Sequence, residues 1–372
     1  MTSHSTHTLP PVTAVIPVYN LAAYLPDTIE SVLSQSYQGP LSIIILDDGS
    51  TDSSFEIASN YANTYQSITA HTQPNQGRAK TRNHLLQLAN TEFISWIDGD
   101  DIASPNWIEQ QIGRLLDRSN CVAVSAQGYA MTGKRHAIGP IEHPHDHQTI
   151  HDRHLRGQAN AFFQSCVTIR KSAVSAAGAY DERFPCAEDY SLWLRLAEIG
   201  ELENLPSIHL YYRVHATSAN WVSNIDQRNQ GQQILNEERA KRGLAPIQPS
   251  DTVIPPAKKD DWNRRIFWIN LALKSGNARS ALEMLVVALR KHPTSLVLWL
   301  AAFASLIDTL ISFGNRTKRF QSGRSAEPKK LPIFSIYRFG RFANHLRRRW
   351  MQKRVKGSTS WAAIHDDTEC SG

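Results

Sequence analysis

Residues 12–117 repeat one hydrophobic pattern, and this repetition limits the fold more than any other feature of the chain. Short runs rich in Val and Ile, such as VTAVIPV and LSIIILDD, alternate with amphipathic stretches such as LAAYLPDTIESVLSQ. The short runs are typical of buried strands, and the longer stretches are typical of helices. Strands that alternate with helices form a parallel sheet covered on both faces, so we predict an α/β fold with a mostly parallel sheet.

Polar residues follow three of the predicted strands at the point where each strand ends. They are residues 17–20 (PVYN), 47–50 (DDGS) and 98–101 (DGDD). The carboxyl ends of parallel strands meet at one edge of a sheet, where ligands of such folds bind. We call these three segments the polar edge and predict that they line the functional site.

The stretch SWIDGDD, residues 95–101, places three carboxylates within four positions: Asp98, Asp100 and Asp101. Clustered carboxylates repel one another unless a cation or hydrogen-bond donors compensate them. Mg²⁺ or Mn²⁺ is a natural compensator, because these ions prefer oxygen ligands and bind a few carboxylates together with substrate phosphates. The alternative is an acidic turn in which Asp101 or Ser104 caps the helix that follows.

The chain is less regular beyond residue 130. Residues 130–160 are polar and rich in histidine, and we expect a long loop that crosses the site. The alternative is a zinc site, but HPHDH lacks a helical frame that would place histidines i, i+4 on one face, and no cysteine lies nearby. Residues 161–215 predict a strand, a helix, a turn, an amphipathic helix and a last strand, SIHLYYRVH.

Seven stretches, in this order, resemble the inverting family 2 glycosyltransferases of the GT-A fold. They are AVIPVYN, ILDDGSTD, NQGRAKTRN, FISWIDGDD, GAYDERF, EDYSLWLRLAEIG and YYRVHATSAN, and they cover residues 12–220. The resemblance implies a Rossmann-like nucleotide-binding sheet flanked by helices. It also implies a metal-dependent enzyme that inverts the anomeric carbon while moving a sugar from a nucleotide-diphosphate sugar, such as a UDP-sugar, to a hydroxyl of a glycan, lipid-linked or polysaccharide precursor.

The same resemblance implies that the polar edge holds the nucleotide. Pro17 and Tyr19 would pack against the base, Asn20 would belong to the same nucleotide-sugar site, and Asp48 would accept a hydrogen bond from the base. Each has a structural alternative: Pro17 ends a strand, Tyr19 could lie in the core, and Asp48 could cap the next helix.

An N-x-G…R-N pattern extends the nucleotide-sugar site to residues 75–83. Gly77 would allow close backbone approach, and Arg82 would lie near the diphosphate or tie the polar edge together. Lys80 and Thr81 depart from the small residues usual in the family. A helix cap is the alternative role for Asn75.

The acidic turn matches the D-x-D motif of the family. Asp98 would face the ribose and contribute to the metal site, and Asp100 would coordinate the Mn²⁺ or Mg²⁺ ion that bridges the two phosphates. Asp101 would orient that site. His215 matches a further metal ligand, although a single histidine after a strand is often structural. Arg213 would contact phosphate or brace its loop.

Glu188 and Asp189 open the amphipathic helix DYSLWLRLAEIG and match the acidic pair that supplies the general base in the family. Asp189 is the position that matches the base, which would take the proton of the acceptor hydroxyl. The alternative is that both acids complement the helix dipole, which stabilises a helix by only about 0.3–1 kcal/mol.

We predict five segments along the chain. A proline-dotted linker separates the sugar-transferring domain from a helical region in which two helices resemble a single tetratricopeptide unit. The expected segments are a flexible tail at 1–11, a GT-A domain at 12–245, a linker at 246–260, a helical region at 261–315 and a basic tail at 316–372.

Positive charge is concentrated in the basic tail, since residues 316–356 hold 14 Lys or Arg against one acidic residue. Aromatic residues lie between the arginines, a composition suited to an anionic membrane surface. The alternatives are a helix that is merely solvated and a nucleic-acid partner, and we expect no nucleic acid. The apolar run at 296–313 is short for a span and contains Asp308. With scattered cysteines and no secretory pattern, we expect a cytoplasmic chain, peripheral on the inner leaflet.

Two other functions fit parts of the sequence. A sugar-phosphate nucleotidyltransferase would need a glycine-rich loop after the first strand, where this chain has PVYNLAAYLP. A catalytically degenerate GT-A protein could act as a scaffold at the membrane. The intact D-x-D and Glu-Asp pairs count against that alternative.

Overall fold

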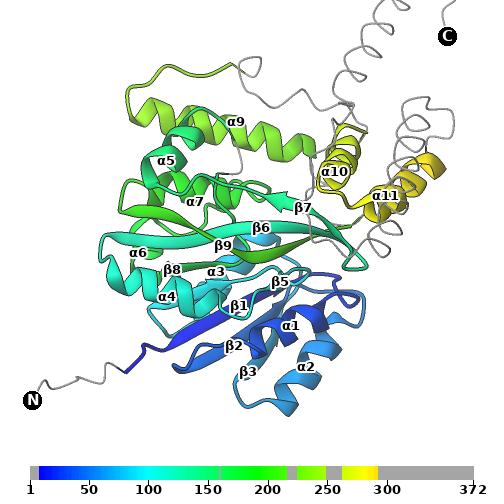
Figure 1. Cartoon of the computed structure of the whole chain (residues 1–372). Helices are drawn as coiled ribbons and strands as arrows, with labels where there is room; N and C mark the ends of the chain where they lie inside the picture. Colours follow the sequence, from blue (N-terminus) through cyan, green and yellow to red (C-terminus); the bar gives the residue numbers. More distant parts are fainter. Residues whose placement is uncertain (1–7, 159–160, 216–223, 249–261, 292–372) are drawn as a thin grey trace, which may run out of the picture. The chain divides into compact units, whose positions relative to one another are not determined.

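The first unit of the chain is organised around one sheet, which has nine strands in the described residues. The computed structural model describes residues 8–158, 161–215, 224–248 and 262–291. The chain divides into two units, Met1–Trp262 and Asn263–Gly372. All strands of the sheet belong to the first unit (Figure 1).

The amino-terminal half of the sheet is parallel. Its strands lie in the order β3-β2-β1-β4. β1 therefore lies between β2, which ends at Asp47 and is followed by Asp48, and β4, which is followed by the acidic turn at residues 98–101. The expected alternation of strands and helices is confirmed. The elements are β1 (Val12–Val18), α1 (Leu25–Leu33), β2 (Leu41–Asp47), α2 (Ser54–Thr64), β3 (Ile68–Thr72), α3 (Arg78–Leu88) and β4 (Phe93–Trp96).

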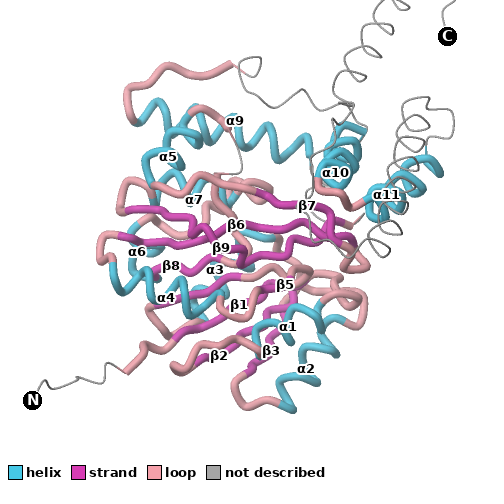
Figure 2. Tube along the Cα trace, in the orientation of Figure 1, coloured by secondary structure: helices cyan, strands magenta, loops and turns pink. Residues whose placement is uncertain are grey.

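The second half of the sheet is mixed and continues as β4-β8-β6-β9-β5, with β7 beside β6 (Figure 2). Only β6 and β9 are parallel there. These strands are β5 (Ile102–Ala103), β6 (Cys121–Thr132), β7 (Ala137–Ile141), β8 (Val167–Arg170) and β9 (Glu201–Val214). The pairing of β5 with β9 matters for function, because it brings the end of β9 to the turn that follows β4.

Helices cover both faces of the sheet, as the alternation predicts. In β1, Val12, Ala14, Ile16 and Val18 face one core with α1 and α4 (Trp107–Asp117). Val15 faces the other core with α3, α6 (Lys171–Ala176) and α7 (Glu188–Leu196). Successive side chains of a strand point to opposite faces, so β1 contributes to both cores.

The prediction of a long loop at residues 130–160 is wrong for most of the segment. The segment contains β7, which pairs with β6, and α5 (His147–Leu155). Asp146 caps α5, since its Oδ1 accepts the backbone N–H of Thr149 at 2.8 Å. Ile138 and Ile150 are fully buried. Two apolar anchors and one cap thus organise a segment whose overall composition is polar.

A helix that the sequence analysis did not identify, α9 (Asn224–Lys241), completes the first unit. Ile234 of α9 packs against Leu194 of α7 and Phe184. Because α7 begins with Glu188 and Asp189, α9 supports the element that carries the predicted base.

The second unit contains the expected pair of helices, α10 (Trp262–Lys274) and α11 (Ala278–Lys291). Predictions for 292–315, for the basic tail and for most of the linker lie outside the described residues. No helix in the described part of the chain has both the length and the apolar composition that crossing a membrane requires.

We predict opposite stability changes for two glycine substitutions. Gly49 has φ +74°, and a Cβ there would lie 2.7 Å from the backbone nitrogen of Asn75. Gly49→Ala should therefore lower the free energy of unfolding by about 1–3 kcal/mol. Gly113 lies inside α4 with open space around a Cβ, so Gly113→Ala should raise it by about 0.5–1 kcal/mol. Denaturation midpoints measure both, and equal shifts would contradict the strained turn.

Candidate active site

The loops after β1 and β2 are tied together by Asn20. Its backbone N–H donates to Ser50 Oγ, and its Oδ1 accepts the backbone N–H of Thr51, both at 2.8 Å. Asn20 has φ +54°, a conformation that asparagine tolerates better than most residues. Tyr19 is 49% exposed, so its ring lies at the surface of the polar edge rather than in the core.

Asp48 connects the polar edge to the start of α3. Its carboxylate accepts the side-chain amide of Gln73 at 2.7 Å and the backbone N–H groups of Gln76 and Gly77 at 2.9 Å. Gly77 has φ +85° and immediately precedes α3. Asp48 therefore holds the 73–77 loop in place, a function that the sequence analysis did not foresee. Its hydrogen bond to a nucleotide base stays a prediction.

The acidic turn after β4 directs its carboxylates to different places. Asp101 is buried, and its Oδ1 accepts the backbone N–H of Arg213 at 2.9 Å. Burial raises the pKa of Asp101, and the neighbouring carboxylates of Asp100 and Asp98 raise it further. The side chains of Asp98 and Asp100 remain more accessible, at 36% and 18% exposure. Asp101 thus anchors the turn, while the D-x-D pair faces outward.

Arg213 braces this turn from β9. Its side chain donates to the backbone oxygen of Asp100 at 2.6 Å and to that of Gly133 at 3.0 Å, and it pairs with Asp27 at 3.0 Å. Of the two roles predicted for Arg213, a phosphate contact or a brace for its loop, the structure shows the brace, because the side chain is almost fully buried. Asp27, on α1, has no local sequence signal that would identify it as a partner.

His215 lies beside Asp100, and the two side chains contact each other directly. Its Nε2 is 2.8 Å from Asp100 Oδ2, and its ring centroid is 4.5 Å from that of Tyr24. Asp98 lies on the other side of the turn, with its Oδ1 3.2 Å from Arg82 Nη2. In the described residues, no three His, Cys, Asp or Glu side chains gather into a metal cluster.

This donor set suits a divalent cation that arrives with a substrate. Two outward carboxylates and one imidazole do not form an all-protein cage. Mg²⁺ is commonly held by one or two carboxylates together with substrate phosphates, and Asp98 and Asp100 could supply such ligands. The ion would supply positive charge to the phosphates, and its presence stays a prediction.

Two arginines of α3 contact Glu188 of α7, and one of them, Arg82, also contacts Asp98 of the acidic turn. Arg82 Nε lies 3.4 Å from Glu188 Oε1, and Arg78 Nε lies 3.6 Å from the same oxygen. Burial alone would lower the pKa of Arg82, but the charges of Asp98, Glu188 and Asp189 raise it above its ordinary value. All three carboxylates are therefore within electrostatic reach of one guanidinium. The sequence analysis missed Arg78.

The two acids at the start of α7 differ in exposure. Glu188 is 1% exposed, and burial raises its pKa against the opposing effect of Arg78 and Arg82. Asp189 is partly exposed, and its Oδ1 accepts the backbone N–H of Tyr190 at 2.7 Å. An acceptor hydroxyl could therefore approach Asp189 more readily than Glu188.

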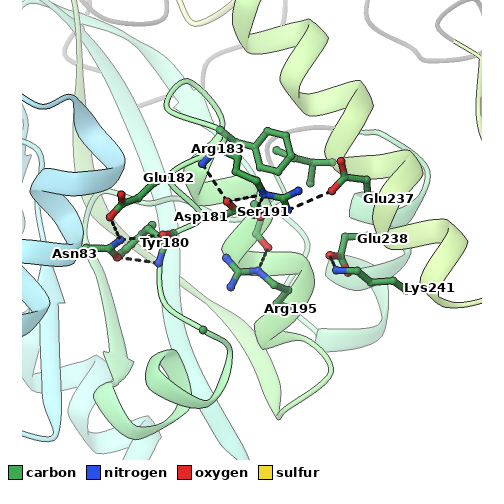
Figure 3. Close-up of a pocket in the computed structure, with 13 residues that line it drawn as sticks. Asn83, Tyr180, Asp181, Glu182, Arg183, Ser191, Arg195, Glu237, Glu238 and Lys241 are labelled. Carbon is green, nitrogen blue, oxygen red and sulfur yellow. Dashed lines mark hydrogen bonds and ion pairs between the residues drawn. The ribbon is translucent and has the colours of Figure 1, made fainter.

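A cavity of about 360 Å³ lies between the 178–184 turn, α7 and α9 (Figure 3). Its charges pair within its own wall, as in Asp181 with Arg183 and Glu238 with Lys241, both at 2.7 Å. Asn83 binds the backbone of Tyr180 through two hydrogen bonds of 2.9 Å. Asn83 therefore fastens this turn to α3, next to Arg82.

The histidine-rich segment does not form a metal cluster within the described residues. His147 and His151 do have i, i+4 spacing in α5, which the sequence analysis did not recognise, and His151 lies 3.3 Å from Glu198. His154 is buried in the same helix, and burial lowers its pKa to about 3. It packs on the ring of Tyr190, at 5.7 Å between centroids, so α5 supports α7.

The parallel half, the mixed half that returns to it and the D-x-D pair between them are the features of a GT-A-type α/β fold. The sequence profile of Glycosyl transferase family 2 matches residues 13–178. A Bacillus subtilis protein described as a glycosyltransferase, EpsE, is 30% identical over 195 residues, which are 51% of this chain and 68% of that protein. The chain belongs to glycosyl transferase family 2 and is a transferase.

The chain is also similar to other proteins, among them the following two. An uncharacterised glycosyltransferase of Haemophilus influenzae is 25% identical over 247 residues, 61% of this chain and 73% of the relative. The crystal structure of S. aureus TarS 1-349 in complex with UDP superimposes with a TM-score of 0.47 and 15% identity, covering 87% of this chain and 94% of that one. The chain spans less than two thirds of several other relatives.

We predict that Arg213→Met lowers the free energy of unfolding by about 3 kcal/mol, because it removes the buried hydrogen bonds to Asp100 and Gly133 and the ion pair with Asp27. The matched control is Arg135→Met. Arg135 also pairs with Asp27, at 3.2 Å, but its side chain is 63% exposed. Its loss should cost less than about 0.5 kcal/mol. Chemical denaturation measures both, and similar losses would show that the Asp27 pair, not the brace, is what matters.

Proposed function

We propose that this transferase is an inverting, metal-dependent enzyme that moves a sugar from a UDP-sugar to a hydroxyl of a glycan, lipid-linked or polysaccharide precursor. Membership of the family supports a nucleotide-sugar donor. The observation that carries the proposal is the position of Arg82, which contacts Asp98 at 3.2 Å and Glu188 at 3.4 Å. Through this side chain, the D-x-D turn and the acidic start of α7 form one site.

On the donor side, the proposal assigns the nucleotide to the polar edge. Tyr19 offers an exposed ring to the base, and Pro17, Asn20, Asp48 and Gly77 shape the surrounding backbone. Asp98 and Asp100 face outward, where they could hold a Mn²⁺ or Mg²⁺ ion against the diphosphate. When bound, such an ion would stabilise the negative charge that develops on the departing diphosphate.

On the acceptor side, the proposal assigns the general base to Asp189. It would accept the proton of the acceptor hydroxyl while that oxygen attacks the anomeric carbon from the face opposite the nucleotide. Attack from the opposite face inverts the configuration. The carboxylate of Asp189 lies within electrostatic reach of Arg78 and Arg82.

Neither alternative is favoured by the site. The loop after β1, residues 19–24, contains no glycine, so it lacks the run of glycine amides that cradles a triphosphate in nucleotidyl transfer. A scaffold would have no need for an outward D-x-D pair held by His215 and Arg82.

We predict that Asp189→Asn and Asp100→Ala have different effects. Asp189→Asn should bind UDP with Mn²⁺ normally and lower the turnover number by about 10²–10⁴-fold, because only the base is lost. Asp100→Ala should weaken Mn²⁺-dependent UDP binding. Calorimetry measures binding, and release of nucleotide diphosphate from a panel of nucleotide sugars measures turnover. Full activity in Asp189→Asn, or in wild type with EDTA, would contradict the proposal.

We also propose that the basic tail holds the enzyme at an anionic membrane surface, on the cytoplasmic side, near a lipid-linked acceptor. The support is the charge and aromatic composition of residues 316–356. Deletion of residues 316–372 should lower recovery of the protein with anionic vesicles and leave turnover of a soluble acceptor unchanged. Co-sedimentation measures this, and undiminished recovery would count against the anchor.

A further inference from the structure

Arg82 is shared between two carboxylates that come from different elements. Asp98 follows β4 and Glu188 begins α7, and both lie within 3.4 Å of the guanidinium. The Arg82 and Glu188 side chains are 5% and 1% exposed, whereas that of Asp98 is 36% exposed. Two acids therefore draw on one buried cation, and only one of them is open to solvent.

The contacts of Arg82 are electrostatic more than directional. Nε and Nη1 of Arg82 and Oε2 of Glu188 are buried and have no hydrogen-bond partner among the described residues. The guanidinium lies near the rings of Trp96 and Tyr180, at 5.9 and 5.8 Å. A bidentate arginine–carboxylate pair would hold Asp98 much more firmly.

Arg78 completes the arrangement from the outer side of Glu188. Its side chain is 34% exposed and lies 3.6 Å from the same Glu188 oxygen that faces Arg82. Glu188 therefore divides its charge between two arginines, and Arg82 divides its charge between two acids. A change in any one of these charges alters how strongly Arg82 holds Asp98.

We propose that Glu188 is a positioning residue that shares Arg82 with Asp98 and thereby keeps Asp98 available to a donor-bound divalent cation. The inference rests on the proposed function and adds a role for Glu188 that is distinct from the base. Without the charge of Glu188, Arg82 is balanced chiefly by Asp98, so the cation must compete with a stronger ion pair. Without Arg78, Glu188 draws more on Arg82 and releases Asp98.

The test measures two quantities on the full chain: Mn²⁺ binding with UDP present, and UDP binding without metal. Glu188→Gln should weaken Mn²⁺ binding roughly tenfold, because the site gains one net positive charge and Asp98 is held more firmly. Binding of metal-free UDP should stay equal or become tighter, because the ligand is an anion. Arg78→Gln should strengthen Mn²⁺ binding and weaken the binding of metal-free UDP. Glu188→Asp keeps the charge and should restore most of the Mn²⁺ affinity.

Two control variants remove similar charges outside the shared arrangement. Lys80→Gln removes an exposed cation from α3, and Glu182→Gln removes an exposed acid while keeping an acceptor for Asn83. Both should leave Mn²⁺ and UDP binding within about twofold of wild type, as expected for screened surface charges. Manganese titration by electron paramagnetic resonance and calorimetry with UDP provide the readouts.

Several results would overturn the inference. Unchanged Mn²⁺ affinity in Glu188→Gln, or a parallel loss of Mn²⁺ and UDP binding, would reduce Glu188 to a structural residue. If Glu188→Gln does not fold, Arg78→Gln at its partly exposed position decides the question, and weaker Mn²⁺ binding there contradicts the sharing. If wild type binds neither UDP alone nor Mn²⁺ in the presence of UDP, the proposed function fails instead, so the two failures are distinguishable.

Discussion

The hydrogen bond from the backbone N–H of Arg213 to the buried carboxylate of Asp101 joins the two halves of the sheet at the site. The amino-terminal half ends in the acidic turn, and the second half returns to it through the pairing of β5 with β9. Asp100, Asp27 and Gly133 then meet the Arg213 side chain. Asp98 and Asp100 can face outward only because the third carboxylate of the turn faces inward and is held there.

The second constraint on the site is that its clustered carboxylates need nearby positive charge. Three aspartates within four positions, with Glu188 and Asp189 close by, require positive charge. The sequence suggested a divalent cation for this purpose. In the structure, the chain's own arginine already compensates part of the charge, since Arg82 contacts Asp98 and Glu188. A cation at the D-x-D pair would therefore adjust existing ion pairs instead of filling an uncompensated cluster.

The sequence predicted the elements that have strong local patterns. The first four strands and the helices between them follow from runs such as VTAVIPV and LSIIILD. The spacing of Leu192, Leu196 and Ile199 predicted α7, but the helix ends at Leu196 and Ile199 is 42% exposed instead of buried. The β7–α5 segment and α9 were not predicted. The stability of α9 depends on contacts with distant residues, such as Ile234 on Leu194, which a local pattern does not contain. β7 is a short strand that pairs with its neighbour β6, and the polar composition of the segment concealed it.

By itself, the sequence determined the α/β class, the family, and the positions of the D-x-D and Glu-Asp pairs, because hydrophobic periodicity and short motifs are properties of neighbouring residues. Only the tertiary structure decided which acid each arginine compensates and which carboxylate is buried. Arg82 lies 106 positions before Glu188, and Asp27 lies 186 positions before Arg213, the partner it meets at 3.0 Å. Charge interactions depend on distance in space, and that distance exists only after the sheet has brought β9 and α7 to the polar edge.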